Sequence, residues 1–254
     1  MLRTRVIPCL LLRDASLVKT VKFDKAAYIG DPLNTCRIFN ELEVDEMMIL
    51  DISASREGRE PNFKILSSLV SECFMPLSYG GGITTVGQAE RLFLTGFEKI
   101  VVNSVLSSRP DLISEIASTF GTQSVIASID VRKSLFKGYE VVAYSGTRKQ
   151  KTKLIEWAKR LEQLGAGEIL LTSVDREGTW NGYDESLIQQ VAEAVSIPVV
   201  AHGGAGNVEH IGRAVKAGAS AVALGSMVVY QKKGMGVLVN FPDKRELERA
   251  IAAR

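Results

Sequence analysis

Two aspartates, Asp51 and Asp130, each end a short apolar run, "ILD" in the first case and "SVIASID" in the second. A carboxylate at the end of a buried strand is well placed to exchange protons with a bound ligand. The alternative for both residues is structural, with the carboxylate only capping the turn that follows. We expect Asp130 to be a catalytic acid or base, and Asp51 is the weaker candidate.

Glycine-rich turns indicate a second kind of site. The segments "YGGGITT" and "HGGAGN" follow two of the apolar runs, and the small-residue ends "NSV" and "GSM" follow two others. Glycine lets the backbone approach a ligand closely, and free N–H groups at the start of a helix attract an anion. Because these turns occur as two matching pairs, they predict two phosphate sites. The alternative is that the glycines only form turns. A long polar segment, "TSVDREGTWNGYD", also suits ligand contacts.

Four charged residues stand where apolar runs begin: Arg5, Glu46, Lys99 and Glu168. Side chains an even number of residues apart lie on the same face of a strand. The even-spaced pairs are Arg5 with Leu11, Glu46 with Leu50, Lys99 with Asn103, and Glu168 with Thr172. If the second member of each pair faces the inside of a barrel, the two cations and two anions form a ring of ion pairs. The alternative is that all four charges face solvent.

Eight apolar runs, with segments of helical periodicity between them, must position these residues. The runs are 5–12, 46–53, 75–81, 99–105, 124–131, 168–175, 197–204 and 221–227. Parallel strands need crossover connections, and eight such units in about 250 residues are typical of a (β/α)8 TIM barrel. A doubly wound open sheet is the structural alternative. We expect residues 1–254 to form a single domain.

The chain also contains an internal repeat. A segment that begins at Met75 resembles, without a gap, one that begins at Ile197, 122 residues later. The matched positions are Pro76 and Pro198, Gly81–Gly82 and Gly203–Gly204, Gly96 and Gly218, Ser104 and Ser226, and Glu46 and Glu168. Any two β–α–β units share turn glycines, but a match at this many positions indicates two related half-barrels.

Composition limits the class of protein. Of 254 residues, 46% are hydrophobic and 24% charged, and the net charge of +2 argues against a nucleic-acid partner. No apolar run reaches the ~18 residues that span a bilayer, and the N-terminal segment lacks the apolar core of a signal peptide. The cysteines Cys9, Cys36 and Cys73 show no CxxC spacing, which favours reduced thiols in the cytoplasm. His202 and His210 lack an obvious ligand set, so we expect no metal, no cofactor and no membrane partner.

Several of these stretches together resemble the HisF family, the cyclase subunits of imidazole glycerol phosphate synthase. The similar segments are "GDP" at 30–32, "LDISASREGRE", "GGGI", "KIVVNS", "GAGEILLTSVDREGTWNGYD" and "SIPVVAHGGAGNVEH". The resemblance covers essentially the whole chain. The related isomerase family HisA shares the half-barrel plan but not the "TSxDRxGT" signature in this form.

The resemblance implies a barrel that pairs with a HisH-like glutaminase at its N-terminal face. Ammonia released there passes through the barrel to a bis-phosphorylated ribonucleotide derivative, and the reaction gives imidazole glycerol phosphate. The family's ammonia gate matches Arg5, Glu46, Lys99 and Glu168, and one of its catalytic carboxylates matches Asp130. Its substrate-contacting positions match Lys19, in a mobile loop, and Gly82, Asn103, Ser104, Gly204 and Ser226. We add Thr172 to this substrate-binding set.

The chain departs from the family in three places. Leu11 stands where the family has the first of two catalytic aspartates, and leucine can neither donate nor accept a proton. Losing one general catalyst typically lowers the rate by ~10²–10⁴-fold. His202 replaces the serine before the second glycine pair, where it would crowd or add charge to the second phosphate site. The turn "RDASLVK" replaces a lysine-aspartate-glycine turn.

We therefore expect a HisF-like paralogue in a two-chain glutamine amidotransferase, with ammonia conduction kept and the cyclase step impaired. Ammonia would then pass to another acceptor, such as a separate sugar amidotransferase of surface-polysaccharide synthesis. The first alternative is an imidazole glycerol phosphate synthase subunit of histidine biosynthesis, with another group replacing the missing aspartate. The second alternative is a non-catalytic activator of a glutaminase.

Overall fold

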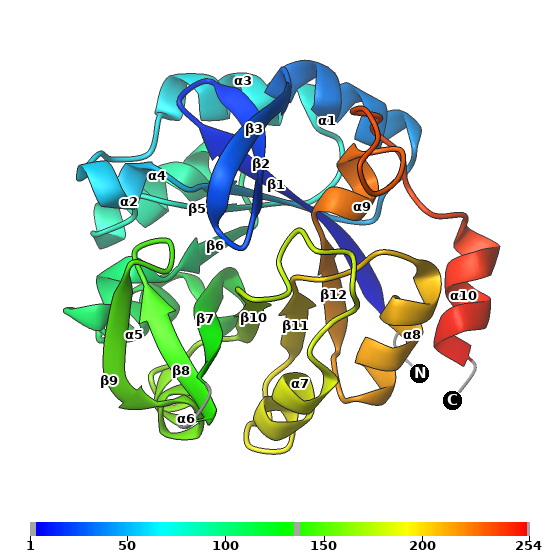
Figure 1. Cartoon of the computed structure of the whole chain (residues 1–254). Helices are drawn as coiled ribbons and strands as arrows, with labels where there is room; N and C mark the ends of the chain where they lie inside the picture. Colours follow the sequence, from blue (N-terminus) through cyan, green and yellow to red (C-terminus); the bar gives the residue numbers. More distant parts are fainter. Residues whose placement is uncertain (1–3, 135–137, 253–254) are drawn as a thin grey trace.

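Eight parallel strands close into a barrel in the computed structural model, which describes residues 4–134 and 138–252 (Figure 1). In order around the barrel they are β1 (Arg5–Arg13), β4 (Met47–Asp51), β5 (Leu77–Gly80), β6 (Lys99–Val102), β7 (Val125–Ser134), β10 (Glu168–Ser173), β11 (Val199–His202) and β12 (Ala221–Leu224). Strand β12 pairs with β1, and β7 pairs with β10, so the ring has no open edge. The (β/α)8 TIM barrel is therefore confirmed, and an open doubly wound sheet is excluded.

Helices surround the barrel and cover its outer face (Figure 1). The longer ones are α1 (Pro32–Glu41), α3 (Phe63–Glu72), α4 (Val86–Thr95), α5 (Leu112–Phe120), α6 (Leu154–Gln163), α7 (Glu185–Ala192), α8 (Val208–Lys216) and α10 (Lys244–Ala252). Local sequence fixes where several of them begin. In α4, for example, the Thr85 hydroxyl accepts a hydrogen bond from the Gln88 N–H at 3.2 Å, and the Gln88 side chain accepts one from the Thr85 N–H at 3.2 Å. This capping box satisfies N–H groups that have no partner inside the helix.

Short helices follow several strand ends: α2 (Ala54–Glu57), η1 (Ser104–Ser107) and α9 (Ser226–Val229), with η2 (Thr122–Ser124) preceding β7. Two antiparallel hairpins extend the barrel strands at the same end. Strands β2 (Ser16–Val21) and β3 (Asp24–Gly30) continue from β1, and β8 (Gly138–Ala143) and β9 (Arg148–Lys153) continue from β7. Both hairpins stand at the C-terminal end of the barrel, where the active sites of this fold lie.

Lys19 is not in a loop, so that expectation is wrong. It lies in β2, where it is 5% exposed, because β2 pairs with β1 on one side and with β3 on the other. The pairing satisfies the backbone of β2 and places its side chains against the barrel mouth.

Apolar side chains line the lumen of the barrel. They come from alternate positions of the strands: Ile7, Cys9, Met48, Leu50, Val101, Ile126, Leu170, Val200, Ala221 and Ala223. The alternation confirms the strand parity inferred from the sequence. Burial raises the pKa of the Cys9 thiol to about 12, so this side chain stays a neutral thiol in the lumen.

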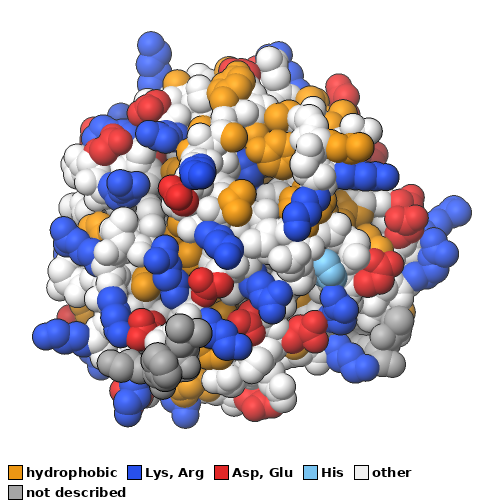
Figure 2. Space-filling view, viewed as in Figure 1, with side chains coloured by type: hydrophobic (Ala, Val, Ile, Leu, Met, Phe, Trp, Pro, Cys, Tyr) orange, Lys and Arg blue, Asp and Glu red, His pale blue; other side chains and the backbone are white. Residues whose placement is uncertain are grey.

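The face seen in Figure 2 carries Lys and Arg side chains interspersed with Asp and Glu, and hydrophobic side chains gather over its upper part. Exposed apolar residues of the β2–β3 hairpin and of the segment after α9 are Val21, Tyr28, Met235, Val237 and Leu238. In the described part of the chain, every helix is too short or too polar to cross a bilayer.

Candidate functional site

A ring of four charged side chains closes the N-terminal end of the lumen. Arg5 donates to Glu46 at 2.8 Å and to Glu168 at 3.0 Å, while Lys99 lies 2.6 Å from Glu168 and 3.8 Å from Glu46. Each cation therefore contacts both anions, and the ring geometry expected from strand parity is confirmed. Ser78 adds a hydrogen bond to Glu46 at 3.3 Å. The role of the ring in passing ammonia stays a prediction.

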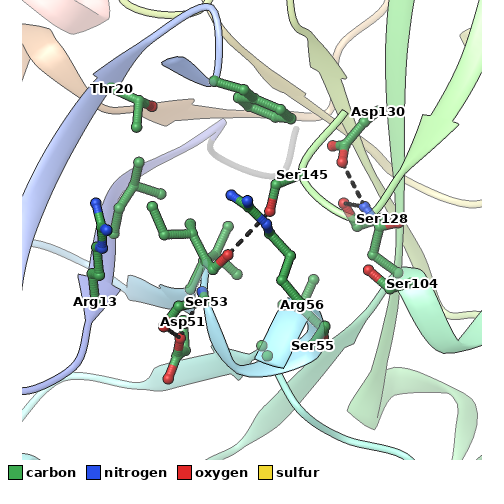
Figure 3. A pocket seen from close by; sticks show the side chains of 18 of the residues that line it. Arg13, Thr20, Asp51, Ser53, Ser55, Arg56, Ser104, Ser128, Asp130 and Ser145 are labelled. Atoms are coloured by element: carbon green, nitrogen blue, oxygen red, sulfur yellow. Dashed lines mark hydrogen bonds between the residues drawn. The ribbon is translucent and has the colours of Figure 1, made fainter. Parts of the chain in front are cut away.

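The C-terminal end of the lumen opens into a cavity of about 430 Å³. Its walls come from the ends of β1, β4, β5, β6 and β7, from both hairpins, and from Thr172 on β10, Glu177 in the segment after β10 and His202 on β11. Figure 3 shows Arg56 reaching from α2 into this cavity, with Arg13 on the opposite wall and the hydroxyls of Ser53, Ser104 and Ser145 around it. The cavity lies at the end of the fold that carries active sites, and Asp130 is among the residues that line it, so we treat it as the candidate active site.

Asp130 lies at this mouth on β7, with 7% of its surface exposed. Its Oδ2 accepts a hydrogen bond from Asn103 Nδ2 at 2.8 Å, and the same amide contacts the Ser128 hydroxyl at 3.2 Å (Figure 3). Burial raises the pKa of Asp130 to about 7, although hydrogen bonds from Asn103 and Thr172 oppose the shift. A carboxyl group that titrates near neutral pH can both give and take a proton.

Leu11 occupies the position in the first half-barrel that Asp130 occupies in the second. Leu11 pairs with Leu50 on β4, and Asp130 pairs with Thr172 on β10. Leu50 and Thr172 are themselves 122 residues apart, the spacing of the internal repeat. The strand register therefore makes Leu11 and Asp130 equivalent, and one wall of the cavity is apolar where the other carries a carboxyl group.

Asp51 caps a turn and also faces the cavity. Its Oδ1 accepts hydrogen bonds from the Ser53 N–H and hydroxyl and from the Ala54 N–H, at 2.9–3.0 Å. Its Oδ2 is buried and has no hydrogen-bond partner within the described residues. Asp51 thus has the turn-capping role that was the structural alternative, and its Oδ2 takes no part in that role.

The first glycine-rich turn borders the cavity. Gly81 and Gly82 have φ angles of 121° and 71°, which a side chain would strain, and the Gly82 N–H donates to the Ser55 hydroxyl at 3.2 Å. Ser104 lies beside them and accepts from the Tyr144 N–H at 3.3 Å. The structure therefore brings two of the predicted phosphate residues, Gly82 and Ser104, to one wall of the cavity, while Asn103 points to Asp130.

The second glycine-rich turn is covered. Ser226 is 6% exposed, and the Gly204 carbonyl accepts from the Gly182 N–H at 2.8 Å. Lys19 lies over this half of the mouth in a buried ion pair with Glu177, a residue of the polar segment after β10. The predicted residues Lys19, Gly204 and Ser226 are thus close in the fold but do not line the cavity.

His202 ends β11 and is 6% exposed, with Nδ1 3.2 Å from the Thr172 hydroxyl. Burial lowers its pKa to about 4, so the side chain is neutral at pH 7. His202 therefore adds bulk at the second turn but no charge. Within residues 4–134 and 138–252, no three His, Cys, Asp or Glu side chains come together in a way that could hold a metal ion.

Sequence reasoning missed three groups of this site: Arg13, Arg56 and Glu177. The spacing of Arg13 from Leu11 is even, so strand parity could have placed it at the mouth. Arg56 lies in the segment "LDISASREGRE", directly after a barrel strand, where active-site loops begin. Glu177 lies in the polar segment "TSVDREGTWNGYD" that was expected to contact a ligand, but its pairing with Lys19 could not be expected, because the two residues are 158 apart in the sequence.

Comparison with known proteins agrees with this geometry. The family model described as "Histidine biosynthesis protein" matches residues 5–234. A "Putative imidazole glycerol phosphate synthase subunit hisF2" of Pseudomonas aeruginosa is 48% identical over 249 residues, 98% of this chain and 99% of the relative. A protein of Leptospira borgpetersenii with the name "Putative imidazole glycerol phosphate synthase subunit HisF" is 46% identical over 98% of both chains.

This chain belongs to the HisF family. The imidazole glycerol phosphate synthase subunit HisF of Solidesulfovibrio magneticus is 43% identical over 235 residues, 91% of both chains. The family assigns the chain to lyase-type synthase subunits, and the mouth of the barrel is where a HisF protein would carry out its chemistry.

Proposed function

We propose that this HisF-family chain is the ammonia-receiving subunit of a two-chain glutamine amidotransferase in which the cyclase step is impaired. A HisH-like glutaminase would bind at the N-terminal face of the barrel, next to the charged ring. Ammonia would pass through the lumen to the mouth and then to an acceptor other than the ring-forming ribonucleotide. Amidation of a sugar for a surface polysaccharide is the acceptor reaction that we favour.

The observation that carries the proposal is the register of strands β1 and β7. It makes Leu11 and Asp130 equivalent, so only one of these two positions carries a carboxyl group, whereas the family chemistry divides acid and base roles between two. Asp130 can exchange a proton near pH 7, but Leu11 cannot take up or return a second one. The step that needs both groups is therefore the step that we expect to be slow.

The lumen supports conduction of neutral ammonia. Its apolar lining would exclude ammonium, because moving an unpaired charge out of water costs much free energy. Moving neutral ammonia out of water costs much less. The entrance is closed by ion pairs among Arg5, Glu46, Lys99 and Glu168. Opening the entrance would require at least one of these ion pairs to separate. The residues of both features are present in this chain.

A separate acceptor enzyme is supported by the surface near the mouth and by the relatives. Exposed apolar side chains of the β2–β3 hairpin and of the segment after α9 provide a surface for contact: Val21, Tyr28, Met235, Val237 and Leu238. The relatives in P. aeruginosa and Vibrio vulnificus carry the numbered names hisF2 and hisF3, which fits a set of paralogues.

The second candidate is a working cyclase for histidine biosynthesis, and Asp51 favours it. Asp51 borders the cavity, its buried Oδ2 has no hydrogen-bond partner among the described residues, and Asp51 pairs in register with Leu12, the neighbour of Leu11. In this case Asp51 would take the role of the missing aspartate. Cyclase activity that is abolished by Asp51→Asn would support this candidate over the first.

Co-expression with the glutaminase encoded nearest to the gene tests the proposal. We expect a stable complex in which the chain stimulates glutamate release, while added ribonucleotide is not converted to imidazole glycerol phosphate. Failure to form a complex, or rapid conversion of the ribonucleotide, would contradict the proposal. Neighbouring genes give a cheaper check, because sugar-nucleotide genes fit the first candidate and histidine genes fit the second.

A further inference from the structure

The two halves of the barrel mouth have matching backbones. Gly82 and Gly204 occupy equivalent positions with φ angles of 71° and 116°, and Ser104 and Ser226 each begin a short helix, η1 and α9. A ligand with two phosphates could use one copy of this backbone at each end. The side chains around the two copies, however, are very different.

The first copy faces the cavity. Gly82 and Ser104 line it, together with Arg56 and the hydroxyls of Ser55 and Ser145. Figure 3 shows the Arg56 guanidinium, Ser104 and Ser145 directed into the same space. A guanidinium group and several hydroxyls around one anion are a common arrangement for holding a phosphate.

The second copy is covered by side chains of this chain. A Cβ at Gly225, the residue before Ser226, would lie 2.9 Å from Lys19 Cε. Lys19 and Glu177 are 5% and 1% exposed and pair with each other. They therefore fill the space above the second glycine-rich turn.

The charge at the second copy is also unsuitable for an anion. The Glu177 carboxylate already accepts hydrogen bonds from Lys19, from the Thr20 hydroxyl at 3.1 Å and from the Phe23 N–H at 3.1 Å. A second phosphate would stand next to this buried carboxylate. His202, which is neutral at pH 7, supplies no compensating charge.

We propose that the cavity takes a phosphomonoester, a ligand with one phosphate group, held by the half of the mouth that contains Gly82 and Ser104. The Lys19–Glu177 pair occupies the place of a second phosphate. This inference rests on the proposed function only in placing the ligand at the barrel mouth, and it does not depend on where ammonia goes. A bisphosphorylated ligand would have to separate a buried ion pair to place its second phosphate.

Titration of the ¹⁵N-labelled full chain with inorganic phosphate tests the inference, with the amide signals of four residues as site-resolved reporters. We expect the Gly82 and Ser104 signals to shift and saturate, and the Gly204 and Ser226 signals to respond with at least ~10-fold weaker affinity. Equal affinities at the two pairs would overturn the inference. So would the absence of a response at Gly82 and Ser104.

A double variant sharpens the test. Lys19→Ala with Glu177→Gln removes the covering pair together with its charges, and we expect Gly204 and Ser226 to gain a phosphate response. Glu156→Gln, which changes an exposed carboxylate on α6 outside the cavity, should leave the pattern of the unmodified chain. If the double variant does not fold, the comparison of the two pairs in the unmodified chain still decides the question.

The phosphate titration and the glutaminase assay test separate claims, so the single-phosphate inference and the proposed function can be contradicted separately. Phosphate binding at both halves would overturn the single-phosphate inference without affecting ammonia conduction, which is measured with the glutaminase. If the chain failed to stimulate the glutaminase but bound phosphate only near Gly82, the proposed function would be contradicted and the single-phosphate inference would be supported.

Discussion

The two ends of the barrel lumen satisfy their charges in different ways. At the N-terminal end, Arg5 and Lys99 each contact both Glu46 and Glu168, at distances from 2.6 to 3.8 Å. At the C-terminal end, Asp130 has hydrogen bonds from neutral groups but no ion pair with any described cation, and burial moves its pKa to about 7.

The charged ring and the mouth therefore depend on different residues of the same strands. The ring depends on the first residues of its strands, which contact one another across the lumen. The mouth depends on the last residues of the strands and on the hairpins beyond them. A leucine at position 11 therefore changes the mouth and leaves all four ring contacts in place.

The largest expected effect comes from restoring the carboxylate at the mouth. Leu11→Asp should raise ammonia-dependent cyclase activity by ~10²–10⁴-fold, because it supplies the second general acid or base. The measurement is imidazole glycerol phosphate formation from the ribonucleotide with saturating ammonium salt. Leu11→Asn is the matched control, since it has a similar shape without a titratable proton. Equal activity in the two variants would show that the carboxylate is not what the mouth lacks.

Glu177→Gln breaks the ion pair that covers the second half of the mouth. It leaves the Lys19 charge buried without an anion, so the free energy of unfolding should fall by ~3–5 kcal/mol in urea titrations. The control is Glu57→Gln, because the Glu57–Arg59 pair is exposed and such pairs contribute only ~0–1 kcal/mol. A similar loss in both variants would mean that the buried pair does not hold the mouth closed.

Asp130 predicts a pH dependence specific to the mouth. Its pKa is about 7 in the folded chain, above the ordinary value of 3.8, so the folded state binds the proton more tightly than the unfolded state. Its contribution to the free energy of unfolding should therefore be greatest below pH 4 and be lost as pH rises to 7, by up to ~1.4 kcal/mol per pH unit.

The pH prediction is measured as the difference in unfolding free energy between the chain and Asp130→Asn. His202 has the opposite dependence, because its lowered pKa makes its contribution disappear as pH falls from 6.5 to 4. Taking the difference removes that second effect. A difference that stays constant from pH 4 to pH 7 would show that Asp130 is not a group that titrates near neutrality.

The smallest expected effect is at the charged ring, at the N-terminal end of the lumen. In the complex with the glutaminase, Lys99→Ala removes one cation from the ring and should raise glutamine consumption per nitrogen transferred by several-fold. Leu11→Asp provides a background in which transfer to the ribonucleotide can be followed. Lys64→Ala, at an exposed position outside the ring, is the control. An unchanged ratio in the Lys99 variant would argue against a gate at this end.

The sequence predicted those features that depend on spacing along one strand. Arg5 and Leu11 share a face of β1 because they are an even number of residues apart, and the same rule gave the whole ring. The two half-barrels were visible as a gapless repeat. These features need no knowledge of which loop lies over which strand.

Features that depend on contacts between distant segments were not predictable in this way. Lys19 was expected in a mobile loop, but pairing of β2 with two strands and the distant Glu177 hold it in a buried site. The covering of Gly204 follows from the same contacts. Arg56 was missed because only the folded α2 turns its side chain into the cavity.

The most direct test of the central claim is the turnover of the unmodified chain with ammonium salt and the ribonucleotide substrate, beside a HisF relative that has the aspartate. The missing carboxylate at Leu11 predicts a rate at least ~10²-fold below that of the relative. A rate equal to that of the relative would contradict the claim that the mouth has lost its cyclase chemistry.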